Sequence, residues 1–313
     1  VLRTLHNQNR YKIAATGSNA GLLEKEIATE LRGRCRNILM MPFSLRECLR
    51  FHNIPHDAKT LLTPARGLVQ KAFEQYLQEG GFPEVVKKET VSEKREMLQN
   101  YYRTIFYRDI IDRYNVKAKT VLESVMRYCL NTYSDLFSIS LFEKELKRQK
   151  LSGSKQTIAN YLGYLQEVFF LTAHEKFSYS PRQRIMNPKK IYLLDLGFSM
   201  LSTSFSENRG KLLENAVAIE LFRRRKESFY YKGRRECDFI IKEGSKPTMA
   251  IQVCWELNAK NELRELKGLQ EAMTSFNIEK GIILTYDEEN KIEFENASIE
   301  VMPVWKWLLQ PIE

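Results

Sequence analysis

Polar residues of catalytic or binding type stand at three places in stretches that are otherwise apolar. Asp238 lies within the apolar run 237–241, and Gln252 lies within the similar run 249–254. Both runs have the length and composition of buried strands. A carboxylate in such a strand is costly unless it binds something. Glu214, in a stretch with the apolar spacing of a helix, is the third member of this set.

The elements that must position these residues follow a simple order. A helix over 212–221 carries Glu214, and residues 244–247, Gly-Ser-Lys-Pro, form the turn between the two strands. A helix over 261–276 and a strand over 280–285 continue the alternation. We therefore expect an α/β unit in which helix, strand and strand bring the polar residues together.

This order resembles the PD-(D/E)xK nuclease fold. In that fold a helix Glu, a strand Asp and a Glu or Gln on the next strand hold Mg²⁺, and a Lys two residues further on helps the attacking water. The resemblance implies a nuclease-like site of Glu214, Asp238, Gln252 and Cys254, with Mg²⁺ held at Asp238 and Gln252. Cys254 stands where the Lys belongs, and a thiol that is mostly neutral at pH 7 supplies no positive charge. Three other cations could replace that Lys from another direction: Lys211, Arg264 and Lys267.

Composition sets limits on the rest of the chain. Its 313 residues suffice for two or three domains, and its 43% hydrophobic and 28% charged residues are ordinary for a globular protein. No apolar stretch approaches ~18 residues, and the first residues contain no apolar secretory core, so we expect a cytoplasmic location and no membrane partner. Five scattered Cys without a CxxC pair argue against a disulfide framework and a zinc site.

The basic charge is concentrated in one segment. The formal net charge is +10, and residues 137–190 hold ten cations against four acids. This excess favours an anionic partner, although a solvated basic face remains the alternative.

That basic segment also has a recognisable order of elements. The spacing predicts helices over 139–149 and 155–168, followed by β runs over 169–173 and 190–194 that flank the polar, basic stretch 176–189. This order resembles a winged helix, whose second helix enters the major groove while the wing reaches phosphate. The resemblance implies duplex DNA as partner, with a winged helix used only for protein packing as the alternative. The cations implied to contact DNA are Lys155, Arg182, Arg184, Lys189 and Lys190.

The N-terminal residues resemble the late part of an AAA-type P-loop ATPase. An apolar strand ends in Thr16-Gly17-Ser18-Asn19, and a helix and the strand 37–41 follow. The resemblance is to the prokaryotic and archaeal group that carries a C-terminal nuclease-like domain. It implies that Ser18 and Asn19 act as sensor 1 and that Arg34 reaches the nucleotide of a neighbouring copy, in a homo-oligomer. Ser18 and Asn19 are equally suited to cap the next helix.

No phosphate loop of the form G-x-x-x-x-G-K-[ST] occurs in the sequence. Without its backbone N–H groups and its Lys, a triphosphate has no cradle. We therefore expect the first half of the ATPase core to be missing and no cofactor for this chain alone. The resemblance implies ATP and Mg²⁺ as cofactors of full-length family members. For this chain, Mg²⁺ at Asp238 is the one cofactor that stays possible.

Residues 61–134 read as helices, and the motif Gly80-Gly81-Phe82-Pro83-Glu84 ends one of them. A second, amphipathic helix is expected over 93–114, and the resemblance places this region in the helical lid of the ATPase. We expect a multi-domain α/β chain with an ATPase part, a helical lid, a winged helix and a restriction-endonuclease-like unit. The expected boundaries are 1–60, 61–135, 136–205 and 206–313.

The function that these patterns favour is DNA binding by a member of the ATPase family whose nuclease-like domain is degenerate. Two alternatives stay open at this point. One is a metal-dependent DNA endonuclease, and the other is a protein-interaction module that contacts no nucleic acid.

Overall fold

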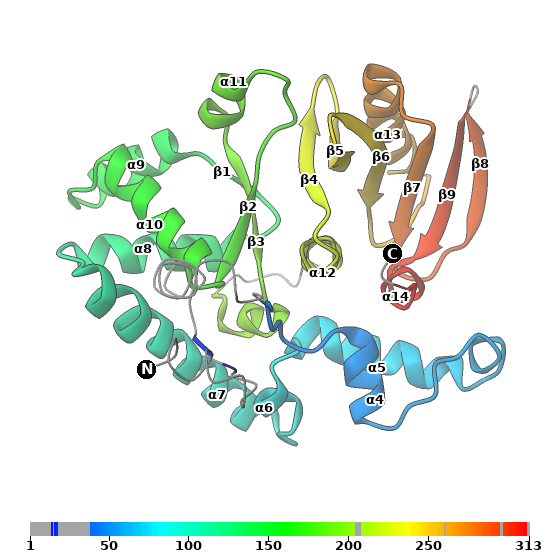
Figure 1. The fold of residues 1–313 in the computed structure, drawn as a ribbon, viewed down its shortest axis with the longest axis horizontal. Helices are drawn as coiled ribbons and strands as arrows, with labels where there is room; N and C mark the ends of the chain where they lie inside the picture. The colour runs from blue at the N-terminus through cyan, green and yellow to red at the C-terminus, as the bar shows by residue number, and fades with distance from the viewer. Residues whose placement is uncertain are drawn as a thin grey trace, which may run out of the picture.

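The computed structural model describes residues 14, 16–17, 38–203, 208–259, 261–294 and 297–311. In these residues the chain is mixed α/β, with one three-stranded and one six-stranded sheet (Figure 1). Ser18, Asn19 and Arg34, the predicted nucleotide contacts, lie outside the described residues. No helix within the described ranges is long and apolar enough to cross a lipid bilayer.

Helices make up the chain before the first sheet. Local signals set their ends: Ser44 with Glu47, and Thr90 with Glu93, form capping boxes at two helix starts, and Gly80, with φ of 75°, ends another. The helix expected over 93–114 is present as α7 followed by the π-helical η3. The elements are α4 (Leu45–Phe51), η2 (Thr60–Leu62), α5 (Arg66–Glu79), α6 (Pro83–Val86), α7 (Val91–Thr104), η3 (Ile105–Asp112) and α8 (Lys119–Asn131).

The three-stranded sheet and its helices form the middle of the chain. Strand β3 lies between β1 and β2 and is antiparallel to both. Ser138 and Ser154 cap the two helices that were expected here. The stretch 176–189 differs from the expected polar connection because it carries a short helix, α11. The elements are β1 (Leu136–Phe137), α9 (Ile139–Arg148), α10 (Lys155–Glu167), β2 (Leu171–His174), α11 (Pro181–Met186), β3 (Lys189–Leu193) and η4 (Leu196–Leu201).

A buried carboxylate connects the first helices to this sheet. Asp195 follows β3, and its two oxygens accept hydrogen bonds from the backbone N–H groups of Gly81 and Gly197, each at 2.8 Å. A Cβ atom on Gly81 would lie 2.1 Å from the carbonyl oxygen of Phe43, so only glycine fits there. The Gly-Gly motif thus ends α5 and also gives Asp195 a close approach to the backbone.

The six-stranded sheet has the order β4-β5-β6-β7-β9-β8, with parallel pairing from β6 to β9 and antiparallel pairing at both edges. Neighbouring residues of β6 alternate between the two faces: Ile251 packs on the side of α12, and Ala250 packs on the side of α13. The elements are α12 (Arg209–Arg223), β4 (Glu227–Lys232), β5 (Glu236–Glu243), β6 (Lys246–Val253), α13 (Glu262–Phe276), β7 (Lys280–Thr285), β8 (Asn290–Phe294), β9 (Ala297–Pro303) and α14 (Val304–Leu308).

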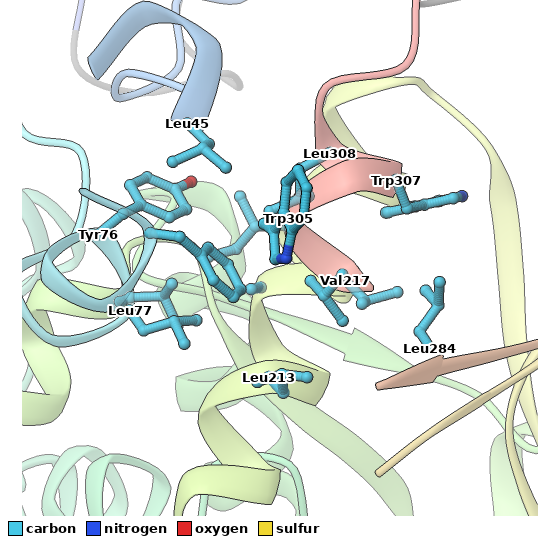
Figure 2. Close-up of a cluster of buried hydrophobic side chains, with 14 of the residues drawn as sticks. Leu45, Tyr76, Leu77, Leu213, Val217, Leu284, Trp305, Trp307 and Leu308 are labelled. Atoms are coloured by element: carbon cyan, nitrogen blue, oxygen red, sulfur yellow. The ribbon is translucent and has the colours of Figure 1, made fainter. Parts of the chain in front are cut away.

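One hydrophobic core joins the two ends of the described chain. Leu45 of α4 and Leu77 of α5 belong to the same buried cluster as Val217 of α12 and Trp305 of α14 (Figure 2). Trp305 is 1% exposed. Helices α4 and α5 therefore share one core with the six-stranded sheet and its helices.

Candidate functional site

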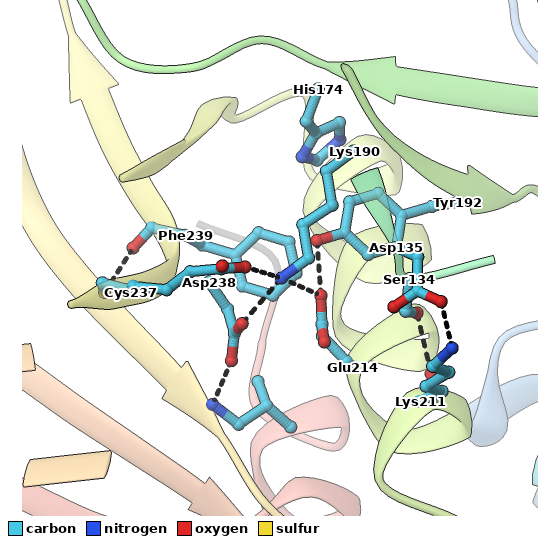
Figure 3. Close-up of polar contacts among 12 residues, drawn as sticks. Ser134, Asp135, His174, Lys190, Tyr192, Lys211, Glu214, Cys237, Asp238 and Phe239 are labelled. Atoms are coloured by element: carbon cyan, nitrogen blue, oxygen red, sulfur yellow. Dashed lines mark hydrogen bonds and ion pairs between the residues drawn. The ribbon is translucent and has the colours of Figure 1, made fainter. Parts of the chain in front are cut away.

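A buried lysine lies at the centre of the residues that the sequence singled out. Lys190 is the second residue of β3. Its Nζ atom is 2.8 Å from Glu214 Oε1 and 2.8 Å from Asp238 Oδ1 (Figure 3). The same atom is 3.0 Å from Glu236 Oε1. Lys190 is only 3% exposed, and Glu214 and Asp238 are buried as well. The site therefore combines one ammonium group with three carboxylates that come from α12 and β5.

Strand and helix periodicity explain how these groups meet. Residues two apart on a strand share a face, so Lys190 and Tyr192 of β3 both point toward α12. The hydroxyl of Tyr192 donates a hydrogen bond to Glu214 Oε1 at 2.6 Å. Asp238 is held by the neighbouring strand, because the backbone N–H of Val253 donates to its Oδ2 at 2.9 Å. Glu214 and Asp238 are thus held in place by protein groups of their own surroundings.

Burial and the neighbouring charges have opposing effects on the pKa values of Glu214 and Lys190. Burial raises the pKa of Glu214 to about 8, with the Asp238 carboxylate adding to the rise and Lys190 opposing it. Burial disfavours the charged form of Lys190, but Asp238 and Glu214 hold its pKa well above the ordinary value. His174, the strand partner of Lys190, has a pKa lowered to about 3 by burial and by the nearby ammonium, so its ring is neutral. The positive charge of the site resides on Lys190.

Gln252 and Cys254 contact groups other than the ammonium of Lys190. The side-chain carbonyl of Gln252 accepts a hydrogen bond from the backbone N–H of Asp238 at 3.3 Å, and its amide donates to Glu265 of α13 at 2.7 Å. Cys254 lies buried in the apolar cluster with Leu269, and burial raises the pKa of its thiol. Cys254 is therefore a packing residue with a neutral thiol in this structure.

The arrangement does not fit the metal ion that the nuclease resemblance implies at Asp238 and Gln252. Mg²⁺ requires oxygen atoms at ~2.0–2.1 Å and Ca²⁺ at ~2.3–2.6 Å, in near-complete coordination shells. Both oxygens of Asp238 are already engaged, one by Lys190 and the other by Val253. Among the described residues, no group of three or more His, Cys, Asp or Glu side chains is placed to hold a metal ion. A divalent cation at Asp238 would meet the ammonium of Lys190.

The cations suggested as replacements for the missing Lys have other partners or none. Lys211 forms an ion pair with Asp135, and Arg264 forms one with its neighbour Glu265. Lys267 is exposed, and no ion pair is seen for it within the described ranges. Lys190 reaches Asp238 instead. Its sequence signal was weak: Lys190 is the first residue of the apolar run 190–194, but it directly follows another lysine, Lys189.

The five cations assigned to DNA contact fall into three groups. Lys155 and Arg182 are exposed, and neither has an acidic partner in the described part of the chain. Arg184 and Lys189 share Glu175, at 3.8 and 2.8 Å. Lys190 is buried among carboxylates, so its assignment to DNA contact is corrected: its ammonium is not available to a phosphate at the surface.

Comparison with protein families divides the chain into three matched regions. Residues 1–49 match the family described as an AAA domain. Residues 70–208 and 209–307 match two domains of unknown function, DUF8612 and DUF4143. The last match begins at the first residue of α12.

Two relatives align along nearly the whole chain. An uncharacterised protein of Methanocaldococcus jannaschii is 33% identical over 314 aligned residues, which cover 97% of this chain and 70% of that protein. An uncharacterised protein of Haemophilus influenzae is 29% identical over 302 residues, which cover 95% of this chain and 71% of that protein.

Proposed function

The chain belongs to the AAA-domain family that contains the Methanocaldococcus jannaschii relative, and from this premise we propose that its middle unit binds duplex DNA. In this proposal residues 136–203, together with the preceding helix α8, act as a winged helix. The nuclease-like unit after them is degenerate and does not cut the bound DNA. The described part of the chain is then the DNA-binding portion of an ATPase-like protein.

The order of elements supports the winged-helix part of the proposal. Helix α8, strand β1, helices α9 and α10, and strands β2 and β3 follow one another, and β3 pairs with both β1 and β2. In a winged helix, the helix in the position of α10 enters the major groove. The connection from β2 to β3, which carries α11 and extends beyond the sheet in Figure 1, takes the place of the wing.

The observation that carries the proposal is the exposure of Lys155 and Arg182. Lys155 is the first residue of α10, and Arg182 lies on α11. Both side chains are exposed, and within the described residues neither is neutralised by an acid. Gln156 and Asn160 are also exposed on α10, and polar side chains of this kind contact phosphate and base edges. Unpaired cations on these two helices suit a polyanion that runs across both.

The test is a salt titration of DNA binding by fluorescence anisotropy. The chain should bind duplexes with little sequence preference, and log affinity should fall linearly with log salt. Replacing Lys155 and Arg182 together by Ala should lower the slope by ~1.8, because each lost phosphate contact contributes ~0.9.

A matched control keeps the change in net charge constant. Lys246 and Lys280 are exposed on the six-stranded sheet, and the Lys246→Ala, Lys280→Ala double variant should bind DNA with an unchanged slope. If the slope of log affinity against log salt fell equally in both double variants, binding would depend on net charge alone, and the winged-helix assignment would be rejected. Absence of salt-dependent binding by the parent chain would favour a protein-interaction module.

A further inference from the structure

We propose that the ammonium of Lys190 is the resident cation of the Glu214, Glu236 and Asp238 site, so that the site takes up a divalent metal ion only when this ammonium is removed. The inference concerns the unit that the proposed function describes as nuclease-like, and it does not depend on DNA binding. Lys190 comes from β3, in the preceding unit, whereas the three carboxylates come from α12 and β5.

The distances match an ammonium ion rather than a metal ion. The three oxygen atoms stand 2.8, 2.8 and 3.0 Å from Nζ, which is the normal length of a charge-assisted N–H···O hydrogen bond. A lysine ammonium has three N–H donors and no acceptor, so three carboxylate oxygens satisfy it completely. A metal ion at the same point would leave every oxygen ~0.2 Å or more too far away.

Charge balance makes Lys190 and a metal ion mutually exclusive. The carboxyl groups of Glu214, Glu236 and Asp238 surround one point, and the ammonium of the buried Lys190 is the cation that lies between them. Lys232 approaches Glu236 from the exposed rim at 3.6 Å. His174 packs against Tyr192 beside the site and carries no charge. Removing the ammonium leaves the buried carboxylates without an internal counter-ion.

Flexible carboxylates can then close on a smaller ion. Glu214 and Glu236 have three side-chain torsions each, and the ~0.2 to 1 Å shift from ammonium to metal distance is within their reach. Asp238 remains fixed by Val253 and would supply one oxygen. Once the ammonium is absent and these side chains have shifted, the oxygens of Glu214, Glu236 and Asp238 would form a hard-oxygen set of the kind that binds Mn²⁺, Mg²⁺ or Ca²⁺.

The experiment compares Mn²⁺ binding by the parent chain and by Lys190→Ala, using calorimetric titration and Mn²⁺ electron paramagnetic resonance. The parent chain should bind no Mn²⁺ at this site when Mn²⁺ is present at ~1 mM, which is about the dissociation constant of weak protein sites for divalent cations. Lys190→Ala should bind one Mn²⁺ at least about tenfold more tightly than any site of the parent, with a rise in melting temperature on Mn²⁺ addition. Adding Asp238→Asn to Lys190→Ala should abolish both effects.

Two controls separate this inference from general effects of charge or folding. Lys189→Ala removes the neighbouring lysine, which bonds Glu175 and not the site, and it should gain no Mn²⁺ binding. Lys190→Ala should keep the salt-dependent DNA binding of the parent chain. If the parent chain itself bound no DNA, that result would count against the proposed function and not against this inference.

Three outcomes would overturn the inference. One is Asp238-dependent Mn²⁺ binding by the parent chain. The second is a folded Lys190→Ala variant that takes up no Mn²⁺. The third is a Lys190→Ala variant that stays unfolded by circular dichroism whether or not Mn²⁺ is added, because a metal that can replace the ammonium should restore the fold. If Mn²⁺ restored the fold of an unfolded Lys190→Ala variant, that result would support the inference.

Discussion

The side chain of Asn215 pairs with the backbone of Leu193 as a neighbouring strand would. The N–H of Leu193 donates to Asn215 Oδ1 at 2.9 Å, and Asn215 Nδ2 donates to the carbonyl of Leu193 at 2.8 Å. Asn215 is fully buried and is the residue after Glu214 on α12. This pairing fixes α12 against the end of β3 and thereby sets the distance from Glu214 to Lys190.

Asn215→Ala should destabilise the fold by ~2–4 kcal/mol. The substitution leaves both backbone groups of Leu193 buried without partners, and each such group costs ~1–3 kcal/mol. Urea unfolding followed by circular dichroism measures the change. Asn208→Ala is the matched control, because Asn208 caps the same helix from an exposed position and its loss should cost only ~1 kcal/mol. Equal effects of the two substitutions would show that Asn215 acts only on the helix.

Trp305→Ala should cost ~3–5 kcal/mol, the range for removing a fully buried aromatic side chain. Because Trp305 shares its core with Leu45 and Leu77, tryptophan fluorescence and helix content should still be lost in one transition, shifted to lower urea concentration. Trp255→Ala serves as comparison, since Trp255 is only half-buried and stacks on Tyr286, and it should cost less. Separate transitions for the first helices and the six-stranded sheet would contradict a shared core.

The stability of the chain should fall as pH rises toward neutrality, in part because of Asp195. Burial raises the pKa of Asp195 from 3.8 to about 7, while the N–H groups of Gly81 and Gly197 oppose the rise. A folded-state pKa above the unfolded one means that the contribution is fully present below pH ~4 and is lost as pH passes through ~7, at up to ~1.4 kcal/mol per pH unit.

Urea unfolding at a series of pH values tests this effect. Asp195→Asn should be less stable than the parent at pH 4 and should have a flatter pH dependence between pH ~4 and ~7. The exposed Asp112→Asn should retain the slope of the parent. An Asp195→Asn slope equal to that of the parent would show that another group causes the pH dependence.

ATP should be neither hydrolysed nor bound by the 313 residues alone. They contain no phosphate loop, and a ligand present at ~100 times its Kd would add ~2.7 kcal/mol of stability. We expect no phosphate release and no rise in melting temperature at millimolar ATP beyond that given by inorganic tripolyphosphate. A clear ATP-specific rise would refute this prediction.

Supercoiled plasmid should stay uncut with Mg²⁺ or Mn²⁺. Loss of one group that stabilises charge in the transition state costs ~10²–10³ in rate, and here the lysine of the site is tied to three carboxylates while Cys254 is neutral. Nicking that disappears in Asp238→Ala would overturn the expectation of an inactive site. If that nicking were also lost in Lys267→Ala but kept in Cys254→Ala, Lys267 would be the substitute lysine.

The sequence by itself determined much of the local structure and singled out two members of the polar site, Glu214 and Asp238. Apolar periodicity placed α9 and α10 almost to the residue, because this signal depends only on near neighbours. The lone carboxylates of 214 and 238 also marked a site, since burying a charge requires a partner wherever the chain goes.

Only the tertiary structure decided which partner they have. Lys190 lies 48 residues before Asp238, and its side chain had the same appearance in the sequence as the surface cations around it. The packing of β3 against α12 and β5 decides whether this side chain points to solvent or into the protein. Neither the apolar periodicity nor the number of charges predicts that packing. The same holds for Asn215 and for the core that joins Leu45 to Trp305, because contacts between distant segments arise only when the whole chain is packed.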